Sequence, residues 1–209
     1  MISGVSGVIL AGGKSERMGQ DKAFLVINQR RLIDYVYGVC RLLFSEIVIV
    51  SNHPDRYTDF DARVVVDEIP HAASLGGLYT GLLHSTSDYI FCVACDLPFI
   101  RPELVSYLTT LRTHVDAVIP RVPKGLECLH ALYAQTCLDP IKKQLDQKDL
   151  RMSAFLRQMR VRYCDQYELE PFDPGLLSFT NINTPDDFRN AEELLRNDGC
   201  HYPAEFSAR

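Results

Sequence analysis

The sequence predicts an α/β fold in which a mostly parallel β-sheet lies between two layers of helices. Short apolar runs alternate along the chain with longer amphipathic stretches, which is the order of strands and helices in β–α–β units. The apolar runs are continuous instead of alternating with polar residues, as expected for strands covered on both faces. Together these observations indicate a three-layer, Rossmann-like arrangement, and 209 residues are enough to bury its core in one domain.

The first half of the sequence gives the most regular alternation. Continuous apolar runs such as Ile47-Val48-Ile49-Val50 predict buried strands, and leucines and valines three or four residues apart predict helices. Pro102 stands where a helix is expected to begin, a position that proline favours. In order, we expect a strand over 7–10, a helix over 31–44, strands over 46–51 and 63–66, a helix over 76–85, a strand over 88–94, a helix over 102–111 and a strand over 116–120.

The second half is less regular. Thr184 is followed by Pro185, Asp186 and Asp187, an N-cap signature for the last helix, which Gly199 would end. In this half we expect a strand over 129–134, helices over 138–146 and 152–159, a strand over 161–164 and a helix over 184–196. Residues 1–198 would then form a single domain, and residues 199–209, which show no periodicity, a flexible tail.

The composition limits the classes of binding partner and the cellular compartment that we expect. A net charge of −5 gives no sequence-wide attraction to nucleic acid or to an anionic membrane, so neither is expected as a partner. The cysteines number seven, an odd count that indicates reduced thiols. No apolar run approaches the roughly 20 residues of a membrane helix, and we expect a cytoplasmic protein. Cys92 and Cys95 have CxxC spacing, but residues three apart on a strand point to opposite faces, which disfavours a metal or redox pair.

The residues after the first predicted strand are typical of a polyphosphate site. Gly12 and Gly13 lack Cβ atoms, so backbone N–H groups can approach anionic oxygens closely, and Arg17 and Lys22 supply positive charge. The spacing differs from a Walker A motif and from GxGxxG. A glycine-rich turn with surface cations is the simpler alternative, but it leaves the dense run through Lys22 unexplained.

Polar residues also follow the next predicted strands, and ligands of a parallel α/β sheet bind beyond the carboxyl ends of its strands. Asn52 follows the second strand, Asp67 the third and Asp96 the fourth. Asp96 is suited to hold Mg²⁺, which takes one or two carboxylates plus substrate phosphates. Asp67 accepts hydrogen bonds and could bind the donors of a base edge. Taken alone, Asp96 is as consistent with a turn or N-cap residue, and Asp67 favours a turn.

Two asparagines, Asn181 and Asn183, precede the last predicted helix, whose N-terminus is a ready anion site. Capping of that helix by Thr184 is expected in addition. The six histidines lack the spacing of metal ligands, and each is expected to be a surface or packing residue.

The sequence resembles the molybdenum cofactor guanylyltransferases (the MobA family), nucleotidyltransferases of glycosyltransferase-A type, in the run Leu10-Ala11-Gly12-Gly13-x-Ser15-x-Arg17-Met18-Gly19-x-Asp21-Lys22. The resemblance spans nearly the whole chain except the tail, through Asn52, Asp67, Gly76-Gly77, Cys95-Asp96-Leu97-Pro98, Leu129-His130-Ala131-Leu132-Tyr133 and Asn181-Ile182-Asn183-Thr184-Pro185. The glycine pair resembles the GTP users more than the cytidylyl relatives. One departure, Glu127-Cys128 where relatives carry glutamine or proline, points to a modified acceptor pocket.

The resemblance implies a role for each of these residues. It implies GTP as donor, molybdopterin or Mo-molybdopterin as acceptor and Mg²⁺ as cofactor, with residues 1 to about 100 binding the nucleotide and about 101–198 the acceptor. By resemblance, the nucleotide side comprises Leu10, Ala11, Gly12, Gly13, Lys22, Asn52, Asp67 and Asp96; the acceptor side Asn181, Asn183 and Arg151; the catalytic set Arg17, Lys22 and Asp96; and the metal ligand Asp96.

The implied reaction transfers GMP from GTP to the terminal phosphate of molybdopterin, releases pyrophosphate and forms molybdopterin guanine dinucleotide. A phosphate monoester has a second pKa of about 6, so it is largely dianionic at neutral pH and needs no general base. Cofactor-delivery proteins and molybdoenzymes would be partners. Two other interpretations remain open. One is transfer of CMP to molybdopterin or of a nucleotide to a sugar phosphate. The other is a GTP-binding protein without turnover, against which the set of Arg17, Lys22 and Asp96 argues.

Overall fold

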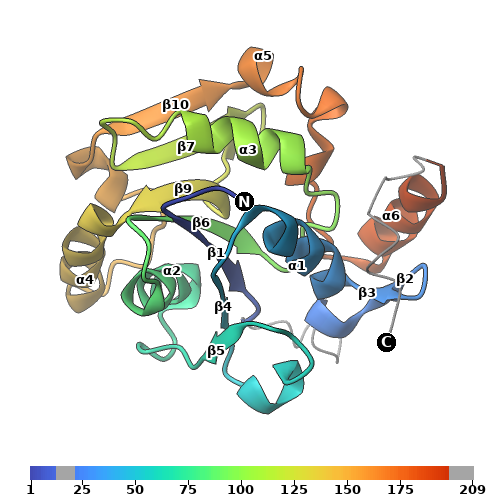
Figure 1. The fold of residues 1–209 in the computed structure, drawn as a ribbon, viewed down its shortest axis with the longest axis horizontal. Helices are drawn as coiled ribbons and strands as arrows, with labels where there is room; N and C mark the ends of the chain where they lie inside the picture. The colour runs from blue at the N-terminus through green and yellow to red at the C-terminus, as the bar shows by residue number, and fades with distance from the viewer. Residues whose placement is uncertain (13–21, 198–209) are drawn as a thin grey trace.

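The computed structural model, which describes residues 1–12 and 22–197, is built around one mixed sheet (Figure 1). Its strands run in the order β10-β7-β9-β6-β1-β4-β5, with β8 paired to β7. Neighbours pair in parallel except at β8 and β9, whose pairings are antiparallel, so the expected mostly parallel α/β sheet is confirmed. The strands are β1 (Val5–Leu10), β4 (Ile47–Val50), β5 (Arg63–Val65), β6 (Tyr89–Ala94), β7 (Ala117–Val122), β8 (Gly125–Leu126), β9 (His130–Ala134) and β10 (Val161–Asp165).

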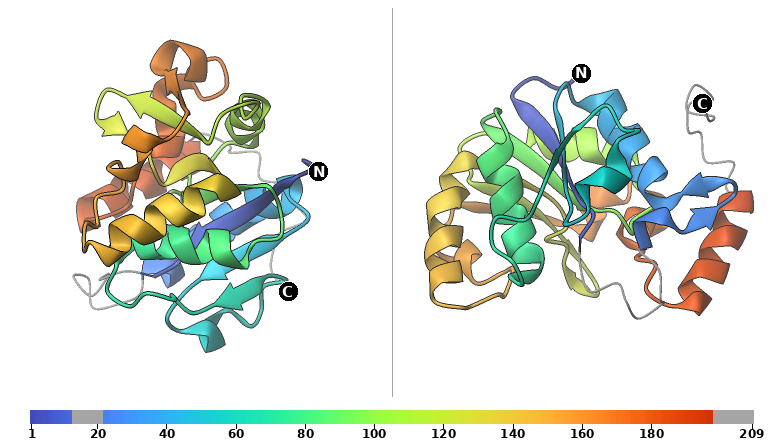
Figure 2. Two further views of the ribbon diagram at one scale, coloured as in Figure 1. Left: turned by 90° about the vertical axis from the view of Figure 1, so that its left-hand side faces the viewer. Right: turned by 90° about the horizontal axis from the view of Figure 1, so that it is seen from below.

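Helices cover both faces of this sheet, as predicted. In Figure 1, α2 and α4 lie together on one side and α1 and α3 on the other, and Figure 2 shows α2 and α4 side by side. Strand β1 divides its side chains between the two cores: Val5 and Ile9 pack toward α1 and α3, whereas Val8 and Leu10 pack toward α2 and α4. The covering helices are α1 (Leu32–Leu43), α2 (Ala73–His84), α3 (Pro102–Thr110) and α4 (Leu138–Asp146).

Helix α2 crosses β1 closely because it carries glycine at the crossing point. A Cβ atom on Gly81 would lie 2.4 Å from Cγ1 of Val8, which real Cβ atoms do not tolerate. Gly38 of α1 differs, because a Cβ atom there would meet nothing within 4 Å. The position of α2 on the sheet therefore depends on Gly81, and so does the position of the residues that precede α2.

A small hairpin that the sequence analysis missed joins the early and late parts of the chain. Strands β2 (Val26–Ile27) and β3 (Arg30–Arg31) pair through a two-residue turn, in which Asn28 and Gln29 have φ values of 49° and 65°. Left-handed conformation at both central residues is the type I′ turn that suits a hairpin, and Asn28 was the available signal. Ile27 of the hairpin belongs to the same apolar cluster as Ile182, Ala191 and Leu195, so helix α6 (Pro185–Asn197) packs against it.

The predicted helix over 152–159 is wrong in extent. Only Phe155–Gln158 is helical, and it forms a short 3₁₀ turn whose buried side chains are Phe155 and Leu156. Gln144 explains the difference, because its Nε2 donates hydrogen bonds to the carbonyls of Asp149 and Arg151 and so holds the preceding loop away from a helical path. The remaining short elements are η2 (Lys22–Phe24), η3 (Pro54–Tyr57), η4 (Gln135–Cys137), α5 (Gln166–Leu169) and η6 (Pro174–Phe179).

The cysteines within the described ranges are free thiols, as predicted, and all of them except Cys95 are buried. Cys200 and the expected tail over 199–209 lie outside the described residues. Among the helices that the structure describes, none has the length and apolar character that crossing a bilayer requires.

Candidate active site

The carboxyl ends of β1, β4, β5 and β6 meet at one edge of the sheet, where backbone hydrogen bonds tie them together. Cys95 N–H donates to the Leu10 carbonyl over 3.1 Å, and Ala11 N–H donates to the Val50 carbonyl over 2.9 Å. Ser51 N–H continues the connection to β5 by donating to the Val65 carbonyl over 2.9 Å. The loops that carry Gly12, Asn52, Asp67 and Asp96 therefore start from a common, fixed edge.

The glycine loop is described only at its two ends. Gly12 is exposed, and a Cβ atom there would have ordinary contacts, the nearest being the Ser51 Cα and the Val50 carbonyl oxygen at 3.9 Å. The fold itself thus does not require glycine at position 12. Gly13 and Arg17, both singled out from the sequence, lie outside the described residues.

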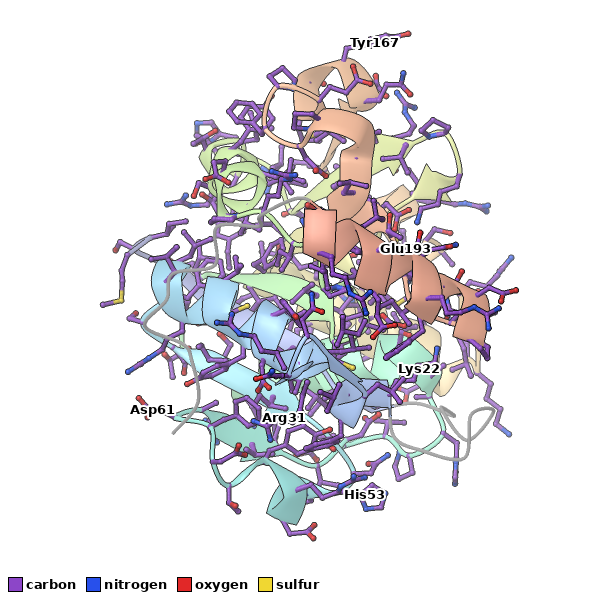
Figure 3. All side chains as sticks on the ribbon, turned by 90° about the vertical axis from the view of Figure 1, so that its right-hand side faces the viewer. Lys22, Arg31, His53, Asp61, Tyr167 and Glu193 are labelled. Carbon is purple, nitrogen blue, oxygen red and sulfur yellow. The ribbon has the colours of Figure 1, made fainter. Side chains whose placement is uncertain are left out.

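Lys22, Asp96 and Asn183 come together from distant parts of the chain. The Lys22 ammonium lies 3.8 Å from Oδ2 of Asp96 and donates a hydrogen bond of 2.7 Å to Oδ1 of Asn183. Ile182 N–H donates to the Asp96 carbonyl over 3.1 Å, which fixes the segment with the asparagines beside the end of β6. Figure 3 shows Lys22 next to α6, the helix that carries Glu193.

The Asp96 carboxylate is held in surroundings that do not satisfy it. Its Oδ1 is buried and has no hydrogen-bond partner among the described residues, and only 17% of the side chain is exposed. Burial raises the pKa of Asp96, while the positive charges of Lys22 and Lys124 oppose that rise. A buried, unpartnered carboxylate oxygen next to a lysine is an arrangement that a bound cation would complete.

Among the described residues, Asp96 is the candidate ligand for a metal ion. Within the described ranges, no group of three or more His, Cys, Asp or Glu side chains is placed to hold a metal ion. Mg²⁺ commonly uses one or two carboxylates and takes its other ligands from substrate phosphates and water, so a single aspartate at this edge fits a metal that arrives with a nucleotide.

Asp67 lies against the beginning of α2. Its Oδ1 accepts hydrogen bonds from Ile69 N–H and from the Thr80 hydroxyl, each over 3.1 Å, and burial raises its pKa. A Cβ atom on Gly76 would lie 3.2 Å from both carboxylate oxygens and 2.6 Å from Cβ of Ala72, so glycine at position 76 lets the helix approach Asp67. Oδ2 accepts no hydrogen bond from the residues that the structure describes.

Of the other predicted site residues, one lies at this edge of the sheet and one does not. Asn52 is exposed just after β4, at the same edge as Asp67. Arg151 is not brought to the asparagines by any contact among the described residues. Its guanidinium forms a two-point interaction with the Asp149 carboxylate, with distances of 2.9 and 2.6 Å.

The helix that follows Asn183 is capped from within. Asp187 accepts hydrogen bonds from the N–H groups of Asn183 and Thr184, and the Thr184 hydroxyl accepts from Asp187 N–H over 3.1 Å. The predicted cap is confirmed, and the N–H groups of Asn183 and Thr184 are already paired with a carboxylate of the same helix. The polar groups that reach the site are the side chains of the asparagines.

Lys124 is a site residue that the sequence analysis missed. It lies in the β7–β8 turn, and its ammonium donates to the Phe179 carbonyl and, over 3.4 Å, to Oδ1 of Asn181. The available signal was a lysine in a turn at the end of a predicted strand, the same rule that identified Asp96. His130 is the buried packing residue that was expected, enclosed by Phe91 and Phe179, and burial lowers its pKa to about 3.

Comparison with known proteins matches residues 7–163 to a family model described as a MobA-like NTP transferase domain. The chain is 34% identical over 194 residues to the molybdenum cofactor guanylyltransferase of Desulfosudis oleivorans, covering 92% of this chain and 96% of the relative. It is 32% identical to the enzyme of that name from Syntrophotalea carbinolica, with 98% of each chain covered. The crystal structure of molybdopterin-guanine dinucleotide biosynthesis protein A from Archaeoglobus fulgidus matches with a TM-score of 0.82 and 27% identity, over 91% of this chain and 98% of that one.

Proposed function

This chain belongs to the MobA-like NTP transferase family, and we propose that it is a nucleotidyltransferase that transfers GMP from GTP to the terminal phosphate of molybdopterin or Mo-molybdopterin. The observation that carries the proposal is the cluster of Lys22, Asp96 and Asn183 at the edge where four strands end. A cation, a buried carboxylate and an amide meet there, between the nucleotide half and the acceptor half of the chain.

On the donor side, Lys22 and Arg17 would bind the triphosphate, while the backbone from Leu10 to Gly13 approaches the nucleotide. Gly12 supports this role, because its own surroundings leave room for a side chain and close approach of a ligand explains the glycine. Asn52 and Asp67 would bind the guanosine part. Guanine presents two donors, N1–H and the 2-amino group, and Oδ2 of Asp67 is an acceptor with no partner among the described residues.

The acceptor phosphate is the nucleophile. One of its oxygens forms a bond to the α-phosphorus of GTP, the bond from that phosphorus to the bridging oxygen breaks, and pyrophosphate leaves with the electron pair. The nucleophile is already a dianion near neutral pH, since its second pKa is about 6, so the chain need not remove a proton. The main obstacle is repulsion between two highly charged groups, which Lys22 and Arg17 reduce.

Asp96 would hold Mg²⁺, which when bound neutralises charge on the phosphate oxygens. Asn181 and Asn183 would orient the acceptor by hydrogen bonds, and Arg151 would contribute a guanidinium from the acceptor half. A cofactor-delivery protein and recipient molybdoenzymes would be the macromolecular partners.

The decisive experiment measures pyrophosphate release with Mg²⁺ and each of GTP, CTP, ATP and UTP, with and without molybdopterin. We expect release that requires both GTP and molybdopterin, because the base contact and the acceptor phosphate are both needed. Release with CTP but not with GTP would instead identify a cytidylyltransferase. Tight GTP binding without any release would identify a nucleotide-binding protein without turnover.

A further inference from the structure

Lys124, like Lys22, lies close enough to Asp96 for its charge to act on that carboxylate. It lies in the tight turn between β7 and β8, where Val122 pairs with Gly125, so the turn projects from the carboxyl end of β7. Strands β6 and β7 both run antiparallel to the intervening β9, and their carboxyl ends therefore lie at the same edge of the sheet. Lys124 thus joins the edge that carries Asp96.

Each of the two lysines donates a hydrogen bond to one of the two asparagines. Lys22 donates to Oδ1 of Asn183 over 2.7 Å, and Lys124 donates to Oδ1 of Asn181 over 3.4 Å. Between these contacts, Ile182 N–H donates to the carbonyl of Asp96. The charges of both lysines also act on the Asp96 carboxylate, lowering its pKa against the effect of burial. Two cations from different loops therefore act on the Asp96 carboxylate.

The strand order separates the loops that carry the two lysines. In the order β10-β7-β9-β6-β1-β4-β5, the strands that carry the nucleotide residues lie to one side of β6, and β7 lies to the other. Adjacent strands are about 4.8 Å apart, so the end of β7 is about 10 Å from the end of β6 on the side away from β1. The turn that carries Lys124 therefore lies on the side of Asp96 away from β1, where a group bound by the acceptor half would approach.

Lys124 is accessible and its ion pair is replaceable. Half of its side chain, 52%, is exposed, and the ammonium lies 3.3 Å from Oε1 of Glu127. Glu127 itself is only 14% exposed, so the pair is half-buried, and among the described residues Glu127 is one of three partners of the ammonium, beside the Phe179 carbonyl and Asn181. A phosphate dianion carries more charge than a carboxylate and offers three oxygens, so it can displace Glu127 from the ammonium.

We propose that Lys124 binds the terminal phosphate of the acceptor, exchanging Glu127 for it, while Lys22 binds the triphosphate of the donor. The proposal rests on the proposed function, and it assigns a role to Glu127, whose carboxylate lies beside the Lys124 ammonium. Glu127 keeps Lys124 paired when the acceptor is absent and competes with the acceptor for it. The two lysines then share the task of bringing two anions together at Asp96.

The test is steady-state GMP transfer from GTP to molybdopterin by the wild-type chain and by Lys124→Gln, Lys124→Arg and Glu127→Gln. For Lys124→Gln we expect the KM for molybdopterin to rise about tenfold or more, which is the scale of one lost charge-assisted hydrogen bond, with the KM for GTP unchanged. Lys124→Arg should restore most of the affinity. Glu127→Gln should lower the KM for molybdopterin, because the competing carboxylate is gone.

Lys142→Gln is the matched control. Lys142 is also a half-exposed lysine, 44% exposed, in an ion pair with a nearby carboxylate, that of Asp146 on α4. Its substitution should change neither KM.

Each outcome decides between the two proposals. If the wild-type chain does not transfer GMP, the proposed function fails before Lys124 is tested. If it does, an equal change of both KM values in Lys124→Gln, or no change in either, overturns the role of Lys124. Should Lys124→Gln lower the melting temperature, Glu127→Gln decides, since an unchanged or raised KM for molybdopterin contradicts the exchange.

Discussion

Asp96 shows at the scale of one residue how this fold prepares a site. One carboxylate oxygen is buried without a hydrogen-bond partner among the described residues, and the other lies 3.8 Å from Lys22, an arrangement that is costly unless a further group completes it. Sequence reasoning reached Asp96 from its place at a strand end. It could not foresee the missing partner, because that depends on residues from 22 to 183 folding around it.

Asp96→Asn keeps the shape of the side chain and removes its charge. We expect kcat for pyrophosphate release to fall by about 100-fold or more, since stabilisation of the charge developing in the transition state is lost, while GTP affinity changes far less. The measurements are kcat from pyrophosphate release and the Kd of GTP from equilibrium binding. Equal losses in both would contradict a role of Asp96 in the chemical step. Asp61→Asn, at a surface aspartate paired with Arg41, should alter neither quantity.

At the scale of elements, the long periodic segments were predictable and the short ones were not. Helix α4 matches its predicted bounds, since its apolar residues fall on one buried face. The hairpin β2–β3 was missed because two-residue strands carry no measurable period. The helix over 152–159 was overpredicted because hydrogen bonds from Gln144, a residue on another element, decide the backbone path there.

The contact between α2 and β1 gives a matched pair of glycine substitutions. Gly81→Ala should destabilise the fold by about 1–3 kcal/mol, because its Cβ would lie 2.4 Å from Val8 and α2 would have to move. Gly38→Ala in α1 has open space and should stabilise by about 0.5–1 kcal/mol through helix propensity. Denaturant unfolding of both variants measures the difference. Equal effects at the two positions would show that α2 does not depend on close contact with β1.

For the whole molecule, the sequence was sufficient to predict the class of fold and that four strands end at one edge of the sheet. It was not sufficient to predict which residues from the early and late parts of the chain come into contact. Lys22 and Asn183 were each identified, but their contact follows from the packing of α6 on the early hairpin through Ile27 and Ala191. No local pattern encodes that packing. The same reason explains why Lys124 was missed, since its contacts with Phe179 and Asn181 join residues 55 and 57 positions apart along the chain.

The acid stability of the molecule should depend on Asp116, which joins the beginnings of β7 and β10. Its carboxylate accepts hydrogen bonds from Arg160 N–H, from the Arg160 guanidinium and from the Thr136 hydroxyl. The hydrogen bonds from Arg160 hold the pKa of Asp116 well below its usual range. A carboxyl whose pKa is lower in the folded state stabilises the fold above its unfolded pKa, about 3.9, and this contribution is lost as the pH falls below that value.

Asp116→Asn should therefore lower the free energy of unfolding by about 1–3 kcal/mol near neutral pH, as expected for lost hydrogen bonds to a buried charge. The difference from wild type should stay constant down to about pH 5 and shrink below about pH 4. Urea unfolding across this range measures it. The exposed pair of Arg121 and Asp165 joins the other ends of the same strands, and Arg121→Gln should change the free energy of unfolding far less. A pH-independent difference for Asp116→Asn would contradict the argument.

The hydrogen bond between Lys22 and Asn183 joins residues 161 positions apart, and this separation determines how late during synthesis the candidate site can form. A ribosome adding about 5–20 residues per second needs about 8–32 s to make the chain between them. Throughout that interval the glycine-rich loop is already synthesised, but its lysine lacks the asparagine that holds it beside Asp96. A nascent chain can thus build the first strands early, yet the complete transfer site forms only when the last helix is delivered, so a truncated product would not carry it.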